Sequence, residues 1–266
     1  MAASRRHIRV RDGRALTGPT VSTACHDLGG NMSTKQFSLV CLPFAGSGAS
    51  VYRGWSPAAL EGRAHLVPVQ LPGREELFGE EPFEDVQETA THLAAGVLEE
   101  LDEASPIVLF GHSLGAVIAY EMAYTIEQKQ PGRLRRLYVS GSGGPEAGRT
   151  DRATGLGDEE FLDRVRQFAG YRHDALDVPE LREVLLPVLR ADVAMHENYR
   201  PTARDPLSVP ITALRGTDDH LVAREEAVEW AATTRVDFVY QELPGGHMYL
   251  VEEPEPLLRV LSGALL

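Results

Sequence analysis

The segment Gly111-His112-Ser113-Leu114-Gly115 places a serine between two glycines, in the pattern Gly-x-Ser-x-Gly. The apolar run "IVLF" precedes it, and "AVIAYEMAYTI", which has helical spacing, follows it. A strand, a tight turn and a helix in this order would lift the Ser113 hydroxyl above the edge of a sheet, because the glycines carry no side chains to clash there. The N–H groups at the helix start would face the same point and stabilise negative charge. The pattern predicts that Ser113 is a nucleophile.

A serine hydroxyl needs a base near neutral pH, and histidine is the usual one. Of the nine histidines, His247 lies in "ELPGGHMYLVEEP", directly after the last expected strand. A glycine-containing loop at this point can bring an imidazole over the strand ends. His112 adjoins Ser113, and its side chain should point elsewhere. We therefore expect His247 to be the base.

The third member of such a site is a carboxylate that follows a strand and lies between the serine and the histidine in the chain. The segment "ITALRGTDDHLV" supplies two adjacent candidates, Asp218 and Asp219. Spacing alone leaves the choice between them open. His220 is a rival base, but a residue adjacent to the carboxylate cannot easily also reach Ser113.

Stabilising the oxyanion of a reaction intermediate requires two backbone N–H donors. One is expected from Leu114, directly after the nucleophile, and the other from a loop after an early strand. The small-residue segment "LPFAGSGAS" fits that loop. A phosphate-binding loop is disfavoured, because the pattern GxxxxGK[ST] is absent and Lys35 precedes the strand.

The elements that must position these residues alternate along the chain. Short β-rich runs such as "FSLVCL", "AHLVPV", "PIVLFG", "LRRLYVS", "VPITALRG" and "VDFVYQEL" alternate with helical patterns, including residues 85–101, "REEAVEWAA" and "PLLRVLSGAL". This alternation predicts an α/β fold with a mainly parallel sheet and helices on both faces.

The chain divides into three parts in this interpretation. Residues 1–35 lack periodicity and are expected to form a flexible extension, whereas residues 36–266 are expected to form one domain. Between about residues 144 and 206 the strand signal gives way to amphipathic helical stretches. We expect this insertion to be a lid over the carboxyl ends of the strands.

Composition narrows the classes of partner. The formal net charge of −13 disfavours nucleic acid and anionic membranes as partners. Two cysteines, far from any metal-ligand spacing, favour a reducing compartment, and no apolar run has the length of a signal peptide or a bilayer span. We expect a cytoplasmic protein that uses no metal and no cofactor.

Several segments together resemble the type II thioesterases, the stand-alone editing enzymes of polyketide synthases and nonribosomal peptide synthetases. The likeness runs from about Phe37 to Leu266 and rests on "LPFAGSGASVYRGW", "VPVQLPGRE", "GHSLGAVIAYEMA", "LRADVAMHENY", "RGTDDHLV" and "LPGGHMYL". The resemblance implies an α/β-hydrolase fold with a helical lid. It also implies a Ser-His-Asp triad that removes acyl groups from the phosphopantetheine arm of acyl or peptidyl carrier proteins, in an enzyme that is monomeric.

Carried over by motif, the resemblance assigns Ser113, His247 and Asp219 to the triad, and the N–H groups of Ala45 and Leu114 to the oxyanion hole. It thereby favours Asp219 over Asp218. One departure lies in the turn "SGSGGPEAG", where the family tends to have an arginine-rich SGRRAP-like sequence. The oxyanion loop also differs, since it reads Ala-Gly-Ser-Gly where AGGS or AGGG is common.

The substrate chamber is expected at the apolar faces of the lid and near the oxyanion loop. The candidate lining residues are Phe44, Leu185, Leu189, Tyr199 and Met248. Further apolar positions on the lid helices are Leu181, Val184, Val188 and Met195. Carrier proteins are generally acidic, so docking would need a local cationic patch, for which Arg53, Arg63 and Arg74 are candidates. Two other functions fit the same residues, a broad carboxylesterase or lipase and a non-hydrolytic scaffold that binds a carrier or an acyl ligand.

Overall fold

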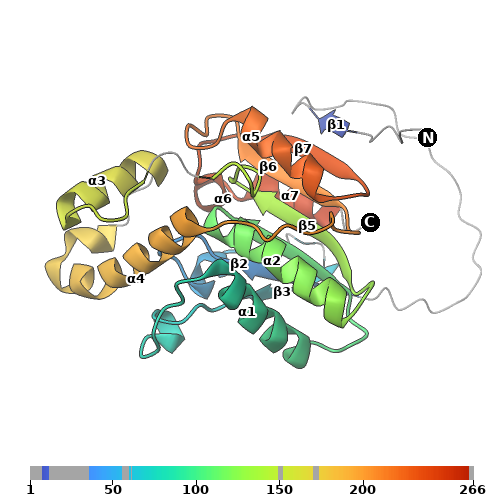
Figure 1. Ribbon diagram of the computed structural model, residues 1–266, viewed down its shortest axis with the longest axis horizontal. Helices are drawn as coiled ribbons and strands as arrows, with labels where there is room; N and C mark the ends of the chain where they lie inside the picture. Colours follow the sequence, from blue (N-terminus) through green and yellow to red (C-terminus); the bar gives the residue numbers. More distant parts are fainter. Residues whose placement is uncertain are drawn as a thin grey trace, which may run out of the picture.

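Seven parallel strands form one sheet in the part of the chain that the computed structural model describes, residues 8–11, 36–55, 60, 62–148, 152–169 and 174–263. The spatial order is β1-β7-β6-β5-β4-β2-β3, and each neighbouring pair is parallel (Figure 1). The strands are β1 (Ile8–Arg11), β2 (Phe37–Leu42), β3 (Ala64–Pro68), β4 (Ile107–His112), β5 (Leu134–Ser140), β6 (Ile211–Gly216) and β7 (Phe238–Leu243). The predicted parallel sheet is confirmed.

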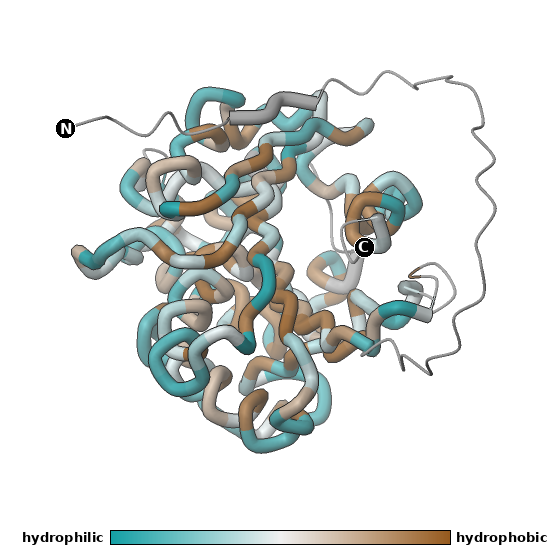
Figure 2. Tube along the Cα trace, turned by 90° about the vertical axis from the view of Figure 1, so that its right-hand side faces the viewer, coloured by the Kyte–Doolittle hydropathy of each residue, from teal (hydrophilic) through white to brown (hydrophobic). Residues whose placement is uncertain are grey.

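Both faces of the sheet are buried, which explains why its strands read as continuous apolar runs. In β2, Val40 and Leu42 belong to one core cluster, whereas Leu39 and Cys41 belong to the cluster on the opposite face. Successive side chains of a strand point to opposite faces, so an apolar residue is needed at every position. Figure 2 shows the hydrophobic residues concentrated in the inner strands and the hydrophilic ones in the outer turns.

Helices cover both faces of this sheet. Apolar residues of α1 (Val86–Glu100), α2 (Leu114–Lys129) and α5 (Arg224–Val228) join the first cluster, and α6 (Tyr249–Glu252) and α7 (Glu255–Gly263) join the second. The predicted helix over residues 85–101 is confirmed by α1, where the Asp85 carboxylate accepts a hydrogen bond from the N–H of Glu88 at 2.8 Å and caps the helix. No helix of the described ranges is long and apolar enough to cross a membrane.

Between β5 and β6, where the sequence predicts an insertion at about residues 144–206, the described residues include helices. They are α3 (Asp158–Ala169), the 3₁₀ helix η4 (Asp174–Asp177) and α4 (Pro179–Asn198), which project to one side of the sheet (Figure 1). A separate small core joins Phe161 and Leu162 of α3 to Leu186, Leu189 and Val193 of α4. Three further 3₁₀ helices of the described residues are η1 (Ala49–Tyr52), η3 (Glu75–Leu77) and η5 (Glu229–Thr233).

The expected N-terminal extension, residues 1–35, lies almost wholly outside the described residues. Its described part is β1, which pairs in parallel with β7, with Ile8 opposite Phe238. The boundary at residue 35 and the extension itself stay predictions.

Candidate active site

The elbow at Ser113 joins the end of β4 to the start of α2. Ser113 has φ 53° and ψ −116°, a conformation that non-glycine residues rarely adopt. Its N–H donates to the Ser140 carbonyl at 2.8 Å. A Cβ at Gly111 would overlap the carbonyl group of Gly115, and one at Gly115 would overlap the Leu42 carbonyl at the end of β2. Both glycines are therefore needed for the close approach of α2 to the strands.

His247 and Asp219 form a buried pair on the loops after β7 and β6. The Nδ1 atom of His247 lies 2.9 Å from Oδ2 of Asp219. The other carboxylate oxygen, Oδ1, accepts hydrogen bonds from the N–H groups of Leu221 and Val222 at 2.8 and 3.1 Å. Burial alone would raise the pKa of Asp219, but the hydrogen bond and the charge of His247 and the two backbone donors outweigh it and lower that pKa. Asp219 is thus ionised near neutral pH.

An ionised carboxylate can only accept, so the Nδ1 atom of His247 carries the proton of this hydrogen bond, and Nε2 is the ring nitrogen left to act as a base. The His247 ring stands beside the elbow, because its centroid is 4.8 Å from that of His112, the residue before Ser113. The structure therefore brings all three expected residues to the carboxyl ends of β4, β6 and β7. This arrangement can supply a nucleophile, a base and a group that orients the base.

The rival residues occupy other surroundings. Asp218 and His220 are exposed, and the Asp218 carboxylate bonds to the Thr217 hydroxyl. His112 is fully buried, with Nδ1 2.8 Å from the Ser140 hydroxyl. Burial and the neighbouring His247 lower the pKa of His112, which keeps it neutral. Nowhere in the described ranges do His, Cys, Asp and Glu gather into a group that could hold a metal ion.

The expected oxyanion donors lie on either side of the elbow. Phe44 to Ser47 form a turn directly after β2, in which the Ser47 N–H donates to the Phe44 carbonyl at 3.0 Å and Gly46 has φ 77°. The N–H groups of Ala45, in this turn, and of Leu114 donate no hydrogen bond to the rest of the described chain. Both are therefore available to a ligand at Ser113.

An apolar cavity of about 80 Å³ adjoins the Ala45 turn. Four of the expected chamber residues line it, Phe44, Leu185, Leu189 and Met248, together with Leu162, Val165 and Leu176 from the insertion. Leu181 and Val184 do not take part, because they are 46% and 39% exposed on the outer side of α4. Met195 packs into the main core instead.

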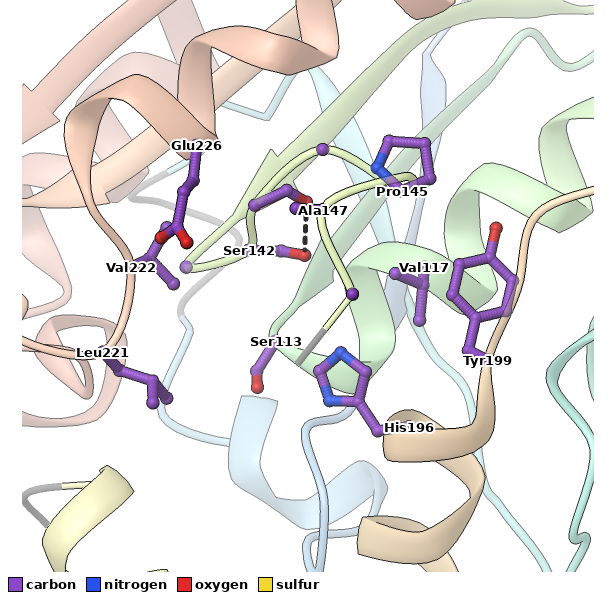
Figure 3. A pocket seen from close by; sticks show the side chains of 14 residues that line it. Ser113, Val117, Ser142, Pro145, Ala147, His196, Tyr199, Leu221, Val222 and Glu226 are labelled. Carbon is purple, nitrogen blue, oxygen red and sulfur yellow. Dashed lines mark hydrogen bonds between the residues drawn. The ribbon is translucent and has the colours of Figure 1, made fainter. Parts of the chain in front are cut away.

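A second cavity, of about 100 Å³, opens directly at Ser113. Its walls include Val117, His196, Leu221 and the turn "SGSGGPEAG" (Figure 3). Tyr199 belongs here and not to the apolar chamber where it was expected. The reason is its hydroxyl, which donates to the buried Glu121 carboxylate of α2 at 2.8 Å and turns the ring toward α2. His196 lines this cavity too, although its sequence context carried no motif.

Two further charged residues near the site escaped sequence reasoning. Arg74 was a candidate for a surface patch but is only 6% exposed, since it pairs with Asp192 of α4, itself 1% exposed. Both residues lie in segments that carry the family resemblance, and Asp192 is also an acidic residue inside the apolar stretch "VLLPVLRADVAM". Such a residue is buried only with a partner, but the partner lies 118 positions away along the chain.

Comparison with known proteins agrees with this geometry. The thioesterase domain family matches residues 37–265. The chain is 35% identical to Thioesterase PikA5 of Streptomyces venezuelae, over 86% of this chain and 80% of that protein, and 32% identical to the gramicidin S biosynthesis protein GrsT of Aneurinibacillus migulanus, over 88% and 90%. The solved structure of RedJ, a thioesterase from the prodiginine biosynthetic pathway in Streptomyces coelicolor, superposes with a TM-score of 0.77 at 32% identity, covering 93% of this chain and 91% of that one.

The fold and the relatives define the class of protein, an α/β-hydrolase whose enzymatic activity is that of a thioesterase. The chain belongs to the thioesterase family, and within it to the type II thioesterases of polyketide and nonribosomal peptide biosynthesis.

Proposed function

We propose that this enzyme removes acyl groups from the phosphopantetheine arm of acyl or peptidyl carrier proteins and so clears misprimed carriers. Ser113 acts as nucleophile, His247 as base and Asp219 as the group that orients the base. The observation that carries the proposal is the buried hydrogen bond between His247 and Asp219 beside the strained Ser113 elbow. The relatives support the substrate class, since they include a gramicidin S biosynthesis protein and a prodiginine-pathway thioesterase.

The first half-reaction forms an acyl-enzyme. Ser113 Oγ attacks the thioester carbonyl carbon while its proton moves to Nε2 of His247, which Asp219 stabilises in the charged form. The negative charge that develops on the carbonyl oxygen is met by the N–H groups of Ala45 and Leu114. The carbon–sulfur bond then breaks, and the thiolate takes the proton from Nε2, leaving a free thiol on the arm.

Water completes the turnover. His247 Nε2 accepts a proton from a water molecule as its oxygen attacks the acyl carbon, through a second oxyanion at the same two N–H groups. The bond from the acyl carbon to Ser113 Oγ breaks, and the proton on Nε2 returns to that oxygen. A carboxylic acid leaves and the site is restored.

In this proposal each of the two cavities holds a different part of the substrate. The acyl chain occupies the apolar cavity next to Ala45, because burying apolar groups there removes them from water. The arm reaches Ser113 through the cavity lined by His196 and Tyr199. A charge of −13 gives no long-range attraction to an acidic carrier, so recognition rests on the arm and on local contacts. A monomeric state and a cytoplasmic location remain predictions from the sequence.

Acyl-loaded carriers provide the test. The enzyme and its Ser113→Ala variant are incubated with carrier domains loaded with acetyl and longer acyl groups, and deacylation is followed by intact-protein mass spectrometry. We expect the wild type to return the free-thiol carrier and the variant to lose activity by roughly 10⁶-fold. Acyl-N-acetylcysteamine and p-nitrophenyl esters are compared by kcat/KM. A strong preference for the oxygen esters would indicate a carboxylesterase, and a wild type as inactive as the variant would indicate a binding scaffold.

A further inference from the structure

A buried ion pair between Arg74 and Asp192 of helix α4 contacts the turn that carries Ala45. Two parallel hydrogen bonds connect Arg74 to Asp192, from Nη1 to Oδ2 at 2.5 Å and from Nη2 to Oδ1 at 2.8 Å. The same Asp192 Oδ2 accepts the N–H of Gly46 at 2.7 Å, and Arg74 Nη1 also donates to the Ser47 carbonyl at 3.1 Å. The two residues that follow Ala45 are thus held from both sides.

The contact at Gly46 fixes the turn itself. The positive φ of Gly46 fits the third position of a type II turn, and its N–H belongs to the central peptide, which links it to Ala45. An acceptor on that N–H favours one orientation of the central peptide over its flipped alternative. Leu189, one turn before Asp192 on α4, packs over the same glycine, because a Cβ at Gly46 would lie 2.8 Å from Leu189 Cδ1. Helix α4 therefore touches the turn through a charge and through an apolar side chain.

Stability alone accounts poorly for such a pair. Removing two charges from water is costly, and replacing a buried ion pair by apolar residues of similar volume is often neutral or stabilising. Both partners also hydrogen-bond the two residues that follow Ala45, so losing the pair would let the turn that carries the Ala45 N–H shift. The position of the pair therefore indicates that its role is to fix the conformation of the turn.

We infer that Arg74 and Asp192 are positioning residues that hold the Ala45 N–H in its productive place only while α4 is docked. The inference rests on the proposed role of Ala45 as an oxyanion donor. It makes the oxyanion donor depend on the position of α4, because Asp192 of α4 is the acceptor of the Gly46 N–H.

The experiment compares variants that separate folding from positioning. In Arg74→Met/Asp192→Leu the pair is replaced by apolar side chains, and in Asp192→Asn only the charge is removed. Asp158→Asn is the control, since the exposed Asp158 pairs with Arg190 of α4 but does not contact the turn. Hydrolysis of acyl-N-acetylcysteamine and of a p-nitrophenyl ester is measured beside thermal unfolding. Affinity for an alkylboronic acid is measured as well, because such acids form a tetrahedral adduct with a nucleophilic serine.

In the double variant we expect an unchanged or higher Tm, a kcat lowered toward the 10²–10³-fold cost of one oxyanion donor, and a KM that changes little. The boronic acid should lose affinity in parallel with kcat, whereas Asp158→Asn should match the wild type. A folded double variant with wild-type kcat, or a lower kcat with unchanged boronic acid affinity, would overturn the inference. If the double variant does not fold, the kcat and the boronic acid affinity of Asp192→Asn test the inference instead. Failure of the proposed function would give a different result. The Ser113→Ala variant would then still bind the boronic acid or still hydrolyse the esters.

Discussion

Two buried aspartates, Asp219 after β6 and Asp192 in α4, have similar surroundings and different partners. Each is at most 2% exposed and pairs with one cationic or ionisable side chain, and Asp219 accepts two backbone N–H groups whereas Asp192 accepts one. The partner of Asp219 is an imidazole, which can gain and lose a proton near neutral pH, whereas that of Asp192 is a guanidinium, which stays charged. We therefore propose that one carboxylate serves proton transfer and the other serves geometry.

Among the substitutions that compare the two aspartates, Asp219→Asn should have the largest effect. An amide in place of the carboxylate no longer favours a proton on Nδ1 of His247, and no longer stabilises the charged imidazole. We expect kcat to fall by about 10⁴-fold with the fold intact. Steady-state hydrolysis of acyl-N-acetylcysteamine measures it.

The neighbouring substitution Asp218→Asn is the matched control, because Asp218 is exposed and its carboxylate accepts a hydrogen bond from the adjacent Thr217 hydroxyl. It should leave kcat within about twofold and stability within about 0.5 kcal/mol. Equal losses in the two variants would contradict the assignment of the carboxylate to Asp219.

On the Asp192 side, Gly46→Ala should have a smaller effect. The new Cβ would meet Leu189 and would hold a side chain at φ 77°, so the turn must shift or α4 must move. We expect kcat to fall about 10- to 100-fold, less than when a donor is removed outright. The assay is again thioester hydrolysis.

Gly54→Ala controls for the loss of a glycine, since a Cβ there meets no atom of the described residues within 4 Å. Its kcat should equal that of the wild type. A Gly46→Ala enzyme with full activity would mean that the turn does not need its present conformation.

The sequence identified the residues around Asp219 more completely than those around Asp192. The Gly-x-Ser-x-Gly pattern within an expected strand, turn and helix located Ser113, and chain order after the last strand located His247, because both depend on local signals. Asp219 and Asp218 are equivalent by spacing, and only the family resemblance separated them. In the structure it is Asp219 that meets His247.

The contacts of α4 depend on tertiary packing, so the sequence could not supply them. The alternation of strands and helices predicted the parallel sheet and the helical insertion. It gave no register between α4 and the loops below it. For that reason Arg74 was taken for a surface residue, and Tyr199 was expected in the apolar cavity. A helical pattern identifies which residues share a face, but not which segment that face meets.

The smallest effect concerns acid stability and again separates the roles of the two aspartates. The pKa of Asp219 is lowered in the folded protein, so it adds stability that is present above its ordinary pKa and is lost as pH falls through the lowered value. Urea unfolding of the wild type and of Asp219→Asn is compared at neutral pH and at successively lower pH. The wild type should lose more of its free energy of unfolding on acidification than the variant, because the amide cannot take up a proton in this range. Parallel losses would mean that the hydrogen bonds from His247, Leu221 and Val222 do not favour the ionised carboxylate, and Asp219 would then be unable to hold the base in the form that the mechanism needs.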